Sequence, residues 1–88
     1  MIYKVEYLPS VYKKMEKMDN FIKRMLYNWI DKNLQNCENP RLLGKPLSSD
    51  RAGQWRYRVG DYRIIVKIED ARLIVLVINV GHRKEVYK

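Results

Sequence analysis

The pattern of apolar and polar positions predicts one strand and two helices in the first half of the chain. Apolar and charged residues alternate at the start, which predicts a strand over residues 2–8. Ser10 is a predicted N-cap for a helix over residues 11–17. A second helix is predicted over residues 20–36, where apolar residues recur every three or four positions. Its apolar stripe consists of Phe21, Ile22, Met25, Leu26, Trp29, Ile30 and Leu34.

The second half of the chain has the character of a β-sheet. Residues 38–53 are rich in Pro, Gly and Ser and are predicted to form a loop. Strands are predicted at 54–59, 62–68 and 72–80, and the last is an apolar run typical of a strand covered on both faces. Gly60-Asp61 is a predicted type II′ turn, because glycine comes first. The order β-α-α-β-β-β predicts an α+β fold, in which two N-terminal helices pack on one face of an antiparallel sheet.

Composition and charge favour a single basic domain spanning residues 1–88. The chain has 18 Lys and Arg against 10 Asp and Glu, a formal charge of +8, which should attract a polyanion. Nucleic acid is the first candidate, an acidic protein is the second, and a membrane surface is third. One cysteine, Cys37, and one histidine make a disulfide, a metal site or another cofactor unexpected. Without a signal peptide or a long apolar run, the chain is expected to be cytoplasmic.

The predicted hairpin brings basic residues together on one face. If Gly60-Asp61 forms the turn, Arg58 faces Arg63, and two-residue periodicity places Arg56 and Lys67 beside them. Like charges opposite each other, with Cβ atoms about 5 Å apart, are destabilising unless something separates them. Arginine grips phosphate with two hydrogen bonds, so this face is a candidate phosphate cradle. The hairpin alone leaves open a second interpretation, an exposed basic face that keeps the sheet soluble.

The C-terminal run from Gly81 to Lys88 contains two residues that can exchange protons, His82 and Tyr87. Together with the arginines they match the needs of RNA transesterification, in which a 2′-hydroxyl loses a proton and a 5′ oxygen gains one. The alternative is a solvated basic terminus. A Gly-rich phosphate loop and an HExxH motif are absent, and the acidic residues are scattered, so nuclease chemistry here should be metal-independent.

Two segments of the sequence carry a resemblance to a known family. The run from Trp55 to Ile65, WRYRVGDYRII, and the run from Val80 to Tyr87, VGHRKEVY, closely resemble the RelE branch of the RelE/ParE toxin superfamily. The resemblance covers essentially the whole chain and implies the compact RelE-like fold. It also implies a ribosome-dependent endoribonuclease that cuts mRNA in the A site and leaves a 2′,3′-cyclic phosphate. A RelB-like antitoxin encoded beside it would wrap and inhibit it in a toxin–antitoxin hetero-oligomer.

The resemblance also assigns roles to individual residues. Arg56 and Arg58 stand at two strand positions that are lysines in the best-studied form of the family. Because arginine does not release its proton in proteins, both are expected, with Arg63, to stabilise phosphate rather than act as a base. Arg83 is expected to stabilise charge on the phosphate and the leaving group, and Tyr87 to act as general base. The remaining candidates are His82 as donor of the leaving-group proton and Lys45, Arg51, Lys67 and Lys84 as RNA contacts.

Three other functions stay open. A ParE-like toxin would inhibit DNA gyrase and needs no RNA-cutting residues. A non-catalytic RNA-binding module would stack bases on aromatic side chains, but Trp55, Tyr57 and Tyr62 are predicted on the core face, away from the arginines. An inactive relative would use its arginines only to hold an acidic antitoxin segment. The apolar stripe of the second helix is interpreted as core, while any surplus apolar surface would suit antitoxin docking.

Overall fold

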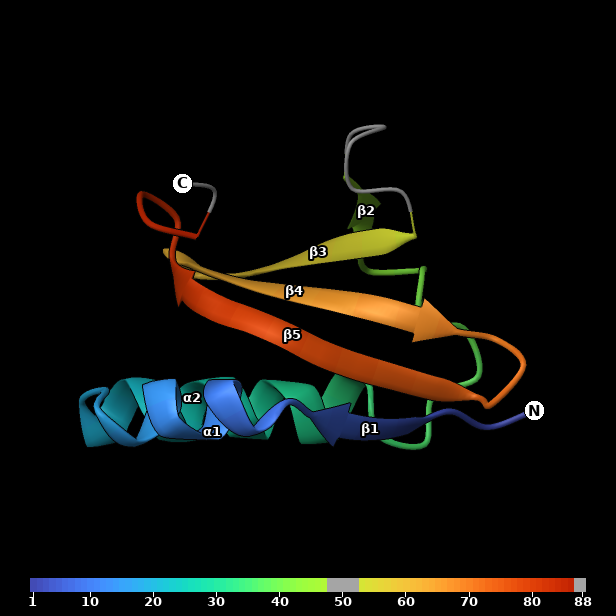
Figure 1. Cartoon of the computed structure of the whole chain (residues 1–88), viewed down its shortest axis with the longest axis horizontal. Helices are drawn as coiled ribbons and strands as arrows, with labels where there is room; N and C mark the ends of the chain where they lie inside the picture. Colours follow the sequence, from blue (N-terminus) through green and yellow to red (C-terminus); the bar gives the residue numbers. More distant parts are fainter. Residues whose placement is uncertain (48–52, 87–88) are drawn as a thin grey trace.

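The computed structural model describes residues 1–47 and 53–86 of the chain. Within these residues the predicted order of elements is confirmed, with one short strand added (Figure 1). The elements are β1 (Lys4–Tyr7), α1 (Pro9–Glu16), α2 (Asn20–Asn33), β2 (Lys45–Pro46), β3 (Gln54–Val59), β4 (Tyr62–Glu69) and β5 (Ile74–His82). Neither helix in this part of the chain is long and apolar enough to cross a membrane.

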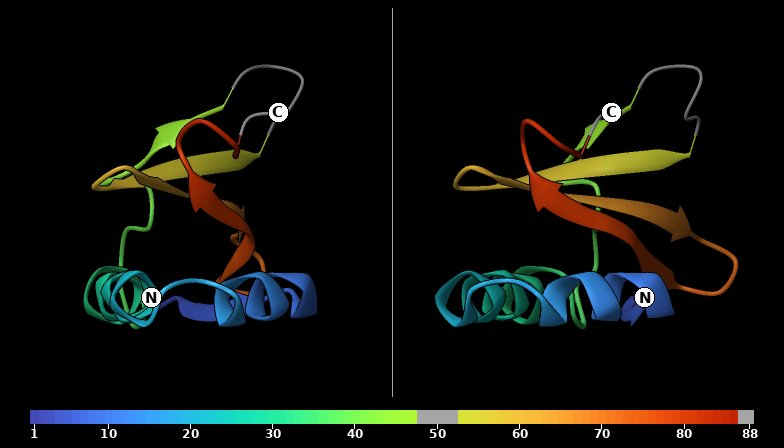
Figure 2. Two further views of the ribbon diagram at one scale, coloured as in Figure 1. Left: turned by 90° about the vertical axis from the view of Figure 1, so that its left-hand side faces the viewer. Right: turned by 60° about the vertical axis from the view of Figure 1, so that its left-hand side comes forward.

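The strands of the described residues form one five-stranded sheet with the order β1-β5-β4-β3-β2. Strands β3, β4 and β5 make an antiparallel meander, while β1 lies parallel to β5, with Lys4 opposite Ile74. The first strand of the chain therefore lies beside the last one. Both helices lie together on one side of the sheet, as the two views of Figure 2 show. The predicted α+β class, with two N-terminal helices packed on one face, is confirmed.

The helix boundaries differ from the predicted ones. The prediction of Ser10 as an N-cap is wrong, because α1 begins at Pro9 and Leu8 occupies the N-cap position without a side-chain hydrogen bond. Proline is tolerated there, since the first N–H groups of a helix have no partner within the helix. Helix α2 ends at Asn33, before the predicted residue 36, and Asn36 takes a left-handed conformation with φ of +63°.

Two boundaries in the β region also differ. The predicted loop over 38–53 contains β2, where Lys45 lies opposite Arg56 of β3, so the prediction of a loop is wrong at this point. The last strand begins at Ile74 rather than residue 72, because Leu73 adopts a left-handed φ of +54° within the preceding turn. It is a central strand, since it lies between β1 and β4. Both helices cover the same face of the sheet, so the prediction of cover on both faces is wrong.

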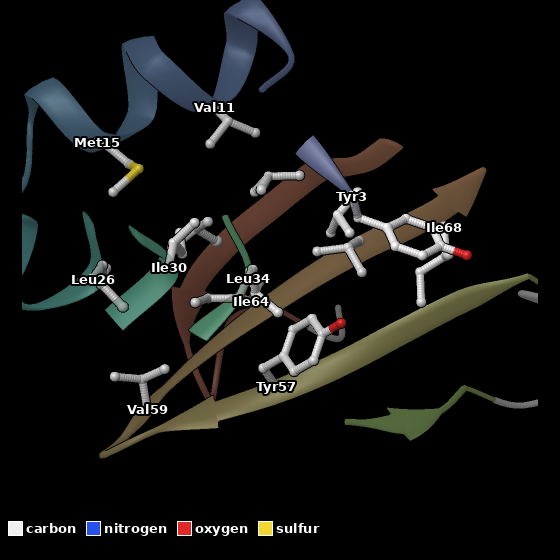
Figure 3. Close-up of a cluster of buried hydrophobic side chains, with 14 residues drawn as sticks. Tyr3, Val11, Met15, Leu26, Ile30, Leu34, Tyr57, Val59, Ile64 and Ile68 are labelled. Atoms are coloured by element: carbon white, nitrogen blue, oxygen red, sulfur yellow. The ribbon is translucent and has the colours of Figure 1, made fainter. Parts of the chain in front are cut away.

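The hydrophobic core lies between the two helices and one face of the sheet (Figure 3). Leu26 and Ile30 of α2 are fully buried there, together with Tyr57 and Ile64 from the hairpin. The predicted helix stripe is therefore correct for its central residues. It is wrong for Phe21, whose side chain is 73% exposed near the start of α2.

Gly44 lies against β3 without room for a side chain. A Cβ atom there would come within 2.9 Å of Tyr57 Cε1 and 3.2 Å of the Arg56 carbonyl oxygen. We expect Gly44→Ala to lower the free energy of unfolding by about 1–3 kcal/mol, because the backbone and the buried ring must move apart. Urea unfolding measures this loss. Gly81→Ala is a matched control, since its nearest neighbour is the flexible Lys14 Nζ at 3.0 Å, and equal losses in both variants would contradict the prediction.

Candidate functional site

The register of the hairpin places its arginines as the sequence predicts. Arg58 lies opposite Arg63 and Val59 lies opposite Tyr62. Gly60 has a φ of +59°, as the first position of a type II′ turn requires. The aromatic residues of the two strands fall on the helix side, and the arginines fall on the other face.

The two facing arginines are kept apart by hydrogen bonds within the turn. Arg63 Nη1 donates to the carbonyl oxygen of Gly60 and to that of Tyr62, both at 2.9 Å. These carbonyl groups hold the Arg63 guanidinium toward the turn and offset part of its repulsion from Arg58. Arg58 is exposed and forms no ion pair with a described residue. It therefore offers its guanidinium to a ligand.

A third arginine reaches the same end of the sheet from the C-terminal segment. The backbone N–H of Arg83 donates to the Asp61 carbonyl oxygen at 2.8 Å, and Arg83 Nε lies 4.0 Å from Asp61 Oδ1. Both side chains are more than half exposed, so this pair is worth little as an ion pair. The backbone contact nevertheless fixes Arg83 at the turn. Arg58, Arg63 and Arg83, on three segments of the chain, thus lie at the same end of the sheet.

Strand β2 adds a second group of basic residues beside this cluster. Lys45 lies opposite Arg56, and the two side chains line a small cavity of about 90 Å³ with Leu43 and Arg58. Arg56 Nε is buried and has no hydrogen-bond partner among the described residues. Lys45 was predicted as an RNA contact, but nothing in the local sequence predicted that it would face Arg56.

The segment that carries β2 is fastened to the sheet by a polar cluster. Asp70 accepts two hydrogen bonds from the Arg41 guanidinium, at 2.8 and 3.1 Å, and one from the Tyr3 hydroxyl at 2.6 Å. The hydrogen bonds from Arg41, which have the largest effect, and the one from Tyr3 hold the pKa of the Asp70 carboxyl below its usual value. Arg41 also lies over the Trp55 ring, 5.7 Å from its centroid. This cluster was not predictable from local sequence patterns, because Tyr3, Arg41 and Asp70 are far apart along the chain.

Tyr57 joins the site to the core and has no role as a base. Tyr57 stands between Arg56 and Arg58 in the sequence, but its side chain points to the opposite face of the sheet and is fully buried. Its hydroxyl donates to the Pro40 carbonyl oxygen. Burial raises the pKa of Tyr57 far above the usual value, so the phenol stays protonated.

His82 does not join the arginines. It pairs with Tyr62 across the β4–β5 ladder, so it lies on the face turned toward the helices, with the two rings edge to face at 5.6 Å. With Lys14 and Lys17 it lines a cavity of about 300 Å³ beside the end of α1. Its Nδ1 accepts a hydrogen bond from the Lys84 N–H at 3.2 Å.

The remaining predicted site residues are only partly placed. Lys67 is exposed on the same face as Arg63, four residues further along β4. Lys84 is exposed in the turn after β5. Arg51 and Tyr87 lie outside the described residues.

Comparison with known families and curated proteins gives a consistent result. A family model described as the ParE toxin of a type II toxin–antitoxin system, parDE, matches residues 5–87. Two toxins of Mycobacterium tuberculosis match over part of the chain. Toxin RelG is 37% identical over 49 residues, covering 56% of each chain, and toxin RelE is 40% identical over 50 residues, covering 57% of this chain and 52% of its own. This chain thus spans about half the length of these relatives in the alignments.

Solved structures share the fold over nearly the whole chain. The toxin–antitoxin complex RelBE2 of M. tuberculosis contains a chain with a TM-score of 0.84 and 26% identity, covering 97% of this chain and 95% of that one. The isolated Escherichia coli RelE toxin aligns with a TM-score of 0.73 and 21% identity, covering 91% and 83%. At this lower identity the likeness concerns the fold alone.

Proposed function

The chain belongs to the ParE toxin family of type II toxin–antitoxin systems, within the RelE/ParE superfamily. From its similarity to the RelG and RelE toxins we propose that it is a ribosome-dependent endoribonuclease that cuts mRNA in the A site. The observation that carries the proposal is the position of Arg58, Arg63 and Arg83 at the same end of the sheet. Three guanidinium groups from three segments suit a phosphate whose negative charge grows in the transition state.

In the proposed reaction the 2′ oxygen of one nucleotide attacks the adjacent phosphorus, and the bond to the 5′ oxygen of the next nucleotide breaks. The products are a 2′,3′-cyclic phosphate and a free 5′-hydroxyl. Tyr87 takes the proton of the 2′-hydroxyl as general base. Arg58 and Arg63 stabilise the phosphate oxygens, and Arg83 also stabilises the departing oxygen. Arg56, which the sequence grouped with Arg58 and Arg63, is not assigned to the reacting phosphate, because it lies opposite Lys45, further from the turn. His82 is left out of this assignment because it lies on the other face of the sheet, so water supplies the final proton.

The proposed cleavage uses side chains alone. Arginines supply the positive charge that metal ions supply in many other nucleases. In the part of the chain that the structure describes, no group of three or more His, Cys, Asp or Glu residues could hold a metal ion.

The distribution of aromatic side chains supports the dependence on the ribosome. Trp55, Tyr57 and Tyr62 all lie on the helix side of the hairpin, so strands β3 and β4 turn their charged residues, and none of their aromatic rings, toward the basic face. Such a face holds the RNA backbone and leaves the bases unread. We therefore expect the ribosome to present the mRNA in the reactive geometry, and the toxin to add the catalytic groups.

We also propose a RelB-like antitoxin as the partner in a hetero-oligomer. The charge of +8 favours an acidic partner, and the similar M. tuberculosis structure is a toxin–antitoxin complex. A groove of about 820 Å³ along α2, with Phe21, Met25 and Trp29 in its lining, offers apolar surface for such a partner. Phe21 is exposed because its side chain lines this groove, which a partner would cover.

The first test incubates the purified chain with ribosomes that display a defined A-site codon, with naked mRNA in parallel. We expect cleavage only on the ribosome, with an end group that is a 2′,3′-cyclic phosphate. Tyr87→Phe should lower the cleavage rate about 100-fold, the lower end of the range for loss of a general base. His82→Gln should retain most of the rate.

The opposite outcome would point to a second candidate function. A folded chain that leaves ribosome-bound mRNA intact contradicts the endoribonuclease proposal. Inhibition of DNA gyrase would then be measured, because the matching family model is named for ParE toxins.

A further inference from the structure

The basic face carries two rows of cationic side chains, and only one of them is used in the reaction proposed above. The first row pairs Arg58 with Arg63 beside the turn, where Arg83 joins them. The second row pairs Lys45 of β2 with Arg56 of β3. Each row places like charges opposite each other across two strands, which is destabilising without an anion between them. The second row therefore needs an explanation of its own.

Arg56 is held differently from Arg58, although both residues lie on the same face of β3. The Arg56 side chain is half-buried and its Nε is shielded from water without a hydrogen-bond partner among the described residues, whereas Arg58 is exposed. A buried donor without a partner is costly, and an incoming anion that stays close to the guanidinium relieves part of that cost. The cavity that Arg56 and Arg58 share with Leu43 and Lys45 has a volume of about 90 Å³. A single phosphate group suits this space better than a nucleobase.

The wall of this cavity is fixed in place at three points. The Pro40 carbonyl oxygen accepts the Tyr57 hydroxyl, and Gly44 packs directly on the Tyr57 ring. Arg41 is clamped by both carboxylate oxygens of Asp70 and covers Trp55. Residues 40–46 are thereby held against β3 before any ligand arrives. Such a preformed wall is what a binding subsite needs.

We propose that Arg56 and Lys45 form a second phosphate subsite, which binds the backbone phosphate next to the one that is cleaved. This inference rests on the proposed function and divides its basic face into two parts. Arg56 and Arg58 are two residues apart on one strand, so their Cα atoms are about 6.7 Å apart, a step comparable to the separation of successive phosphates along a single RNA strand. The second row thus sets the register of the RNA, while the first row acts on the reacting phosphate.

The test is a double-mutant cycle between the protein and its RNA. The substrate is ribosome-bound mRNA in which the nucleotide that would supply the attacking 2′ oxygen is 2′-deoxy. Binding is then measured without cleavage. A neutral methylphosphonate replaces, in separate mRNAs, the scissile phosphate or the phosphate on either side of it. Each mRNA is bound to the wild-type chain, to Arg56→Ala and to Lys45→Ala. Arg72→Ala is the control, because Arg72 lies in the turn at the opposite end of β4 and pairs with Glu69.

We expect one flanking methylphosphonate to weaken binding of the wild-type chain about tenfold or more. Arg56→Ala should lose about as much with normal mRNA and should lose nothing further with that methylphosphonate, because the contact is already absent. Lys45→Ala should show the same coupling to a smaller degree. Lys45 is exposed and outside the core, so this variant tests the subsite even if Arg56→Ala is unstable.

Three results would overturn the proposal in different ways. If the loss of affinity from each protein substitution simply adds to the loss from the methylphosphonate at both flanking positions, Arg56 and Lys45 do not contact these phosphates. Coupling of Arg56 to the scissile phosphate alone would place it in the first row. If the wild-type chain does not bind programmed ribosomes at all, the endoribonuclease function fails and the subsite fails with it.

Discussion

Arg58→Ala is expected to lower the rate of mRNA cleavage on the ribosome about 100- to 1,000-fold, the range observed when one transition-state hydrogen-bond donor is removed. Arg58 stands at the centre of the basic face, with Arg63 opposite it and the Arg56 cavity beside it. Its guanidinium is exposed and is not bound to a described acidic residue, so its charge is available to substrate. Single-turnover cleavage of programmed ribosomes with excess toxin measures the loss.

The controls separate chemistry from folding and from general charge. Arg58 contributes nothing to the core, so the variant should keep its melting temperature within a few degrees. Arg58→Lys keeps the charge but loses the planar fork, so its rate should lie between those of wild type and Arg58→Ala. Arg72→Ala removes an exposed arginine from the far end of the sheet and should change the rate less than about twofold. A similar loss in the Arg72 and Arg58 variants would remove Arg58 from the site.

Tyr57→Ala is expected to lower the free energy of unfolding by about 3–5 kcal/mol, as for other buried aromatic residues. The Tyr57 ring is fully buried and its centroid lies 5.4 Å from that of the Trp29 ring. Gly44 packs against the same ring. The Tyr57 hydroxyl also holds the Pro40 carbonyl oxygen. Domains of this size have a net stability near the lower end of about 5–15 kcal/mol, so the variant should keep at most about 2 kcal/mol and unfold at a much lower temperature than wild type.

Thermal unfolding followed by circular dichroism measures this loss. Tyr12→Ala is the matched control, because Tyr12 is 46% exposed and its ring lies 5.0 Å from the Tyr7 ring between centroids. That control should lose about 1 kcal/mol or less. Tyr57→Phe should keep the packing and lose only the hydrogen bond to Pro40, so its stability should lie between wild type and Tyr57→Ala. Equal stability of Tyr57→Ala and Tyr12→Ala would show that the ring does not support the site.

Within the hairpin, the sequence by itself determined both the fold and the position of the arginines. The Gly60-Asp61 turn fixes which residues face each other, and the two-residue period of a strand then assigns every side chain to a face. Arg58 opposite Arg63, with Tyr57 in the core behind them, follows from these two local rules. The helix stripe was predictable from the helical period, except at Phe21, whose side chain is 73% exposed.

Other features were decided only by contacts between distant parts of the chain. The face of His82 depends on a register irregularity between Ile65 and Val66, which shifts the pairing of β4 with β5 and leaves no local signal. The meeting of Lys45 with Arg56 depends on Gly44 packing against a buried ring, in a segment whose composition predicts a loop. Periodicity and turn chemistry act over a few residues, so they fix a hairpin, whereas strand partners far apart in sequence are chosen by core packing. The first row of arginines was therefore predictable from the sequence, and the second row became visible only in the folded chain.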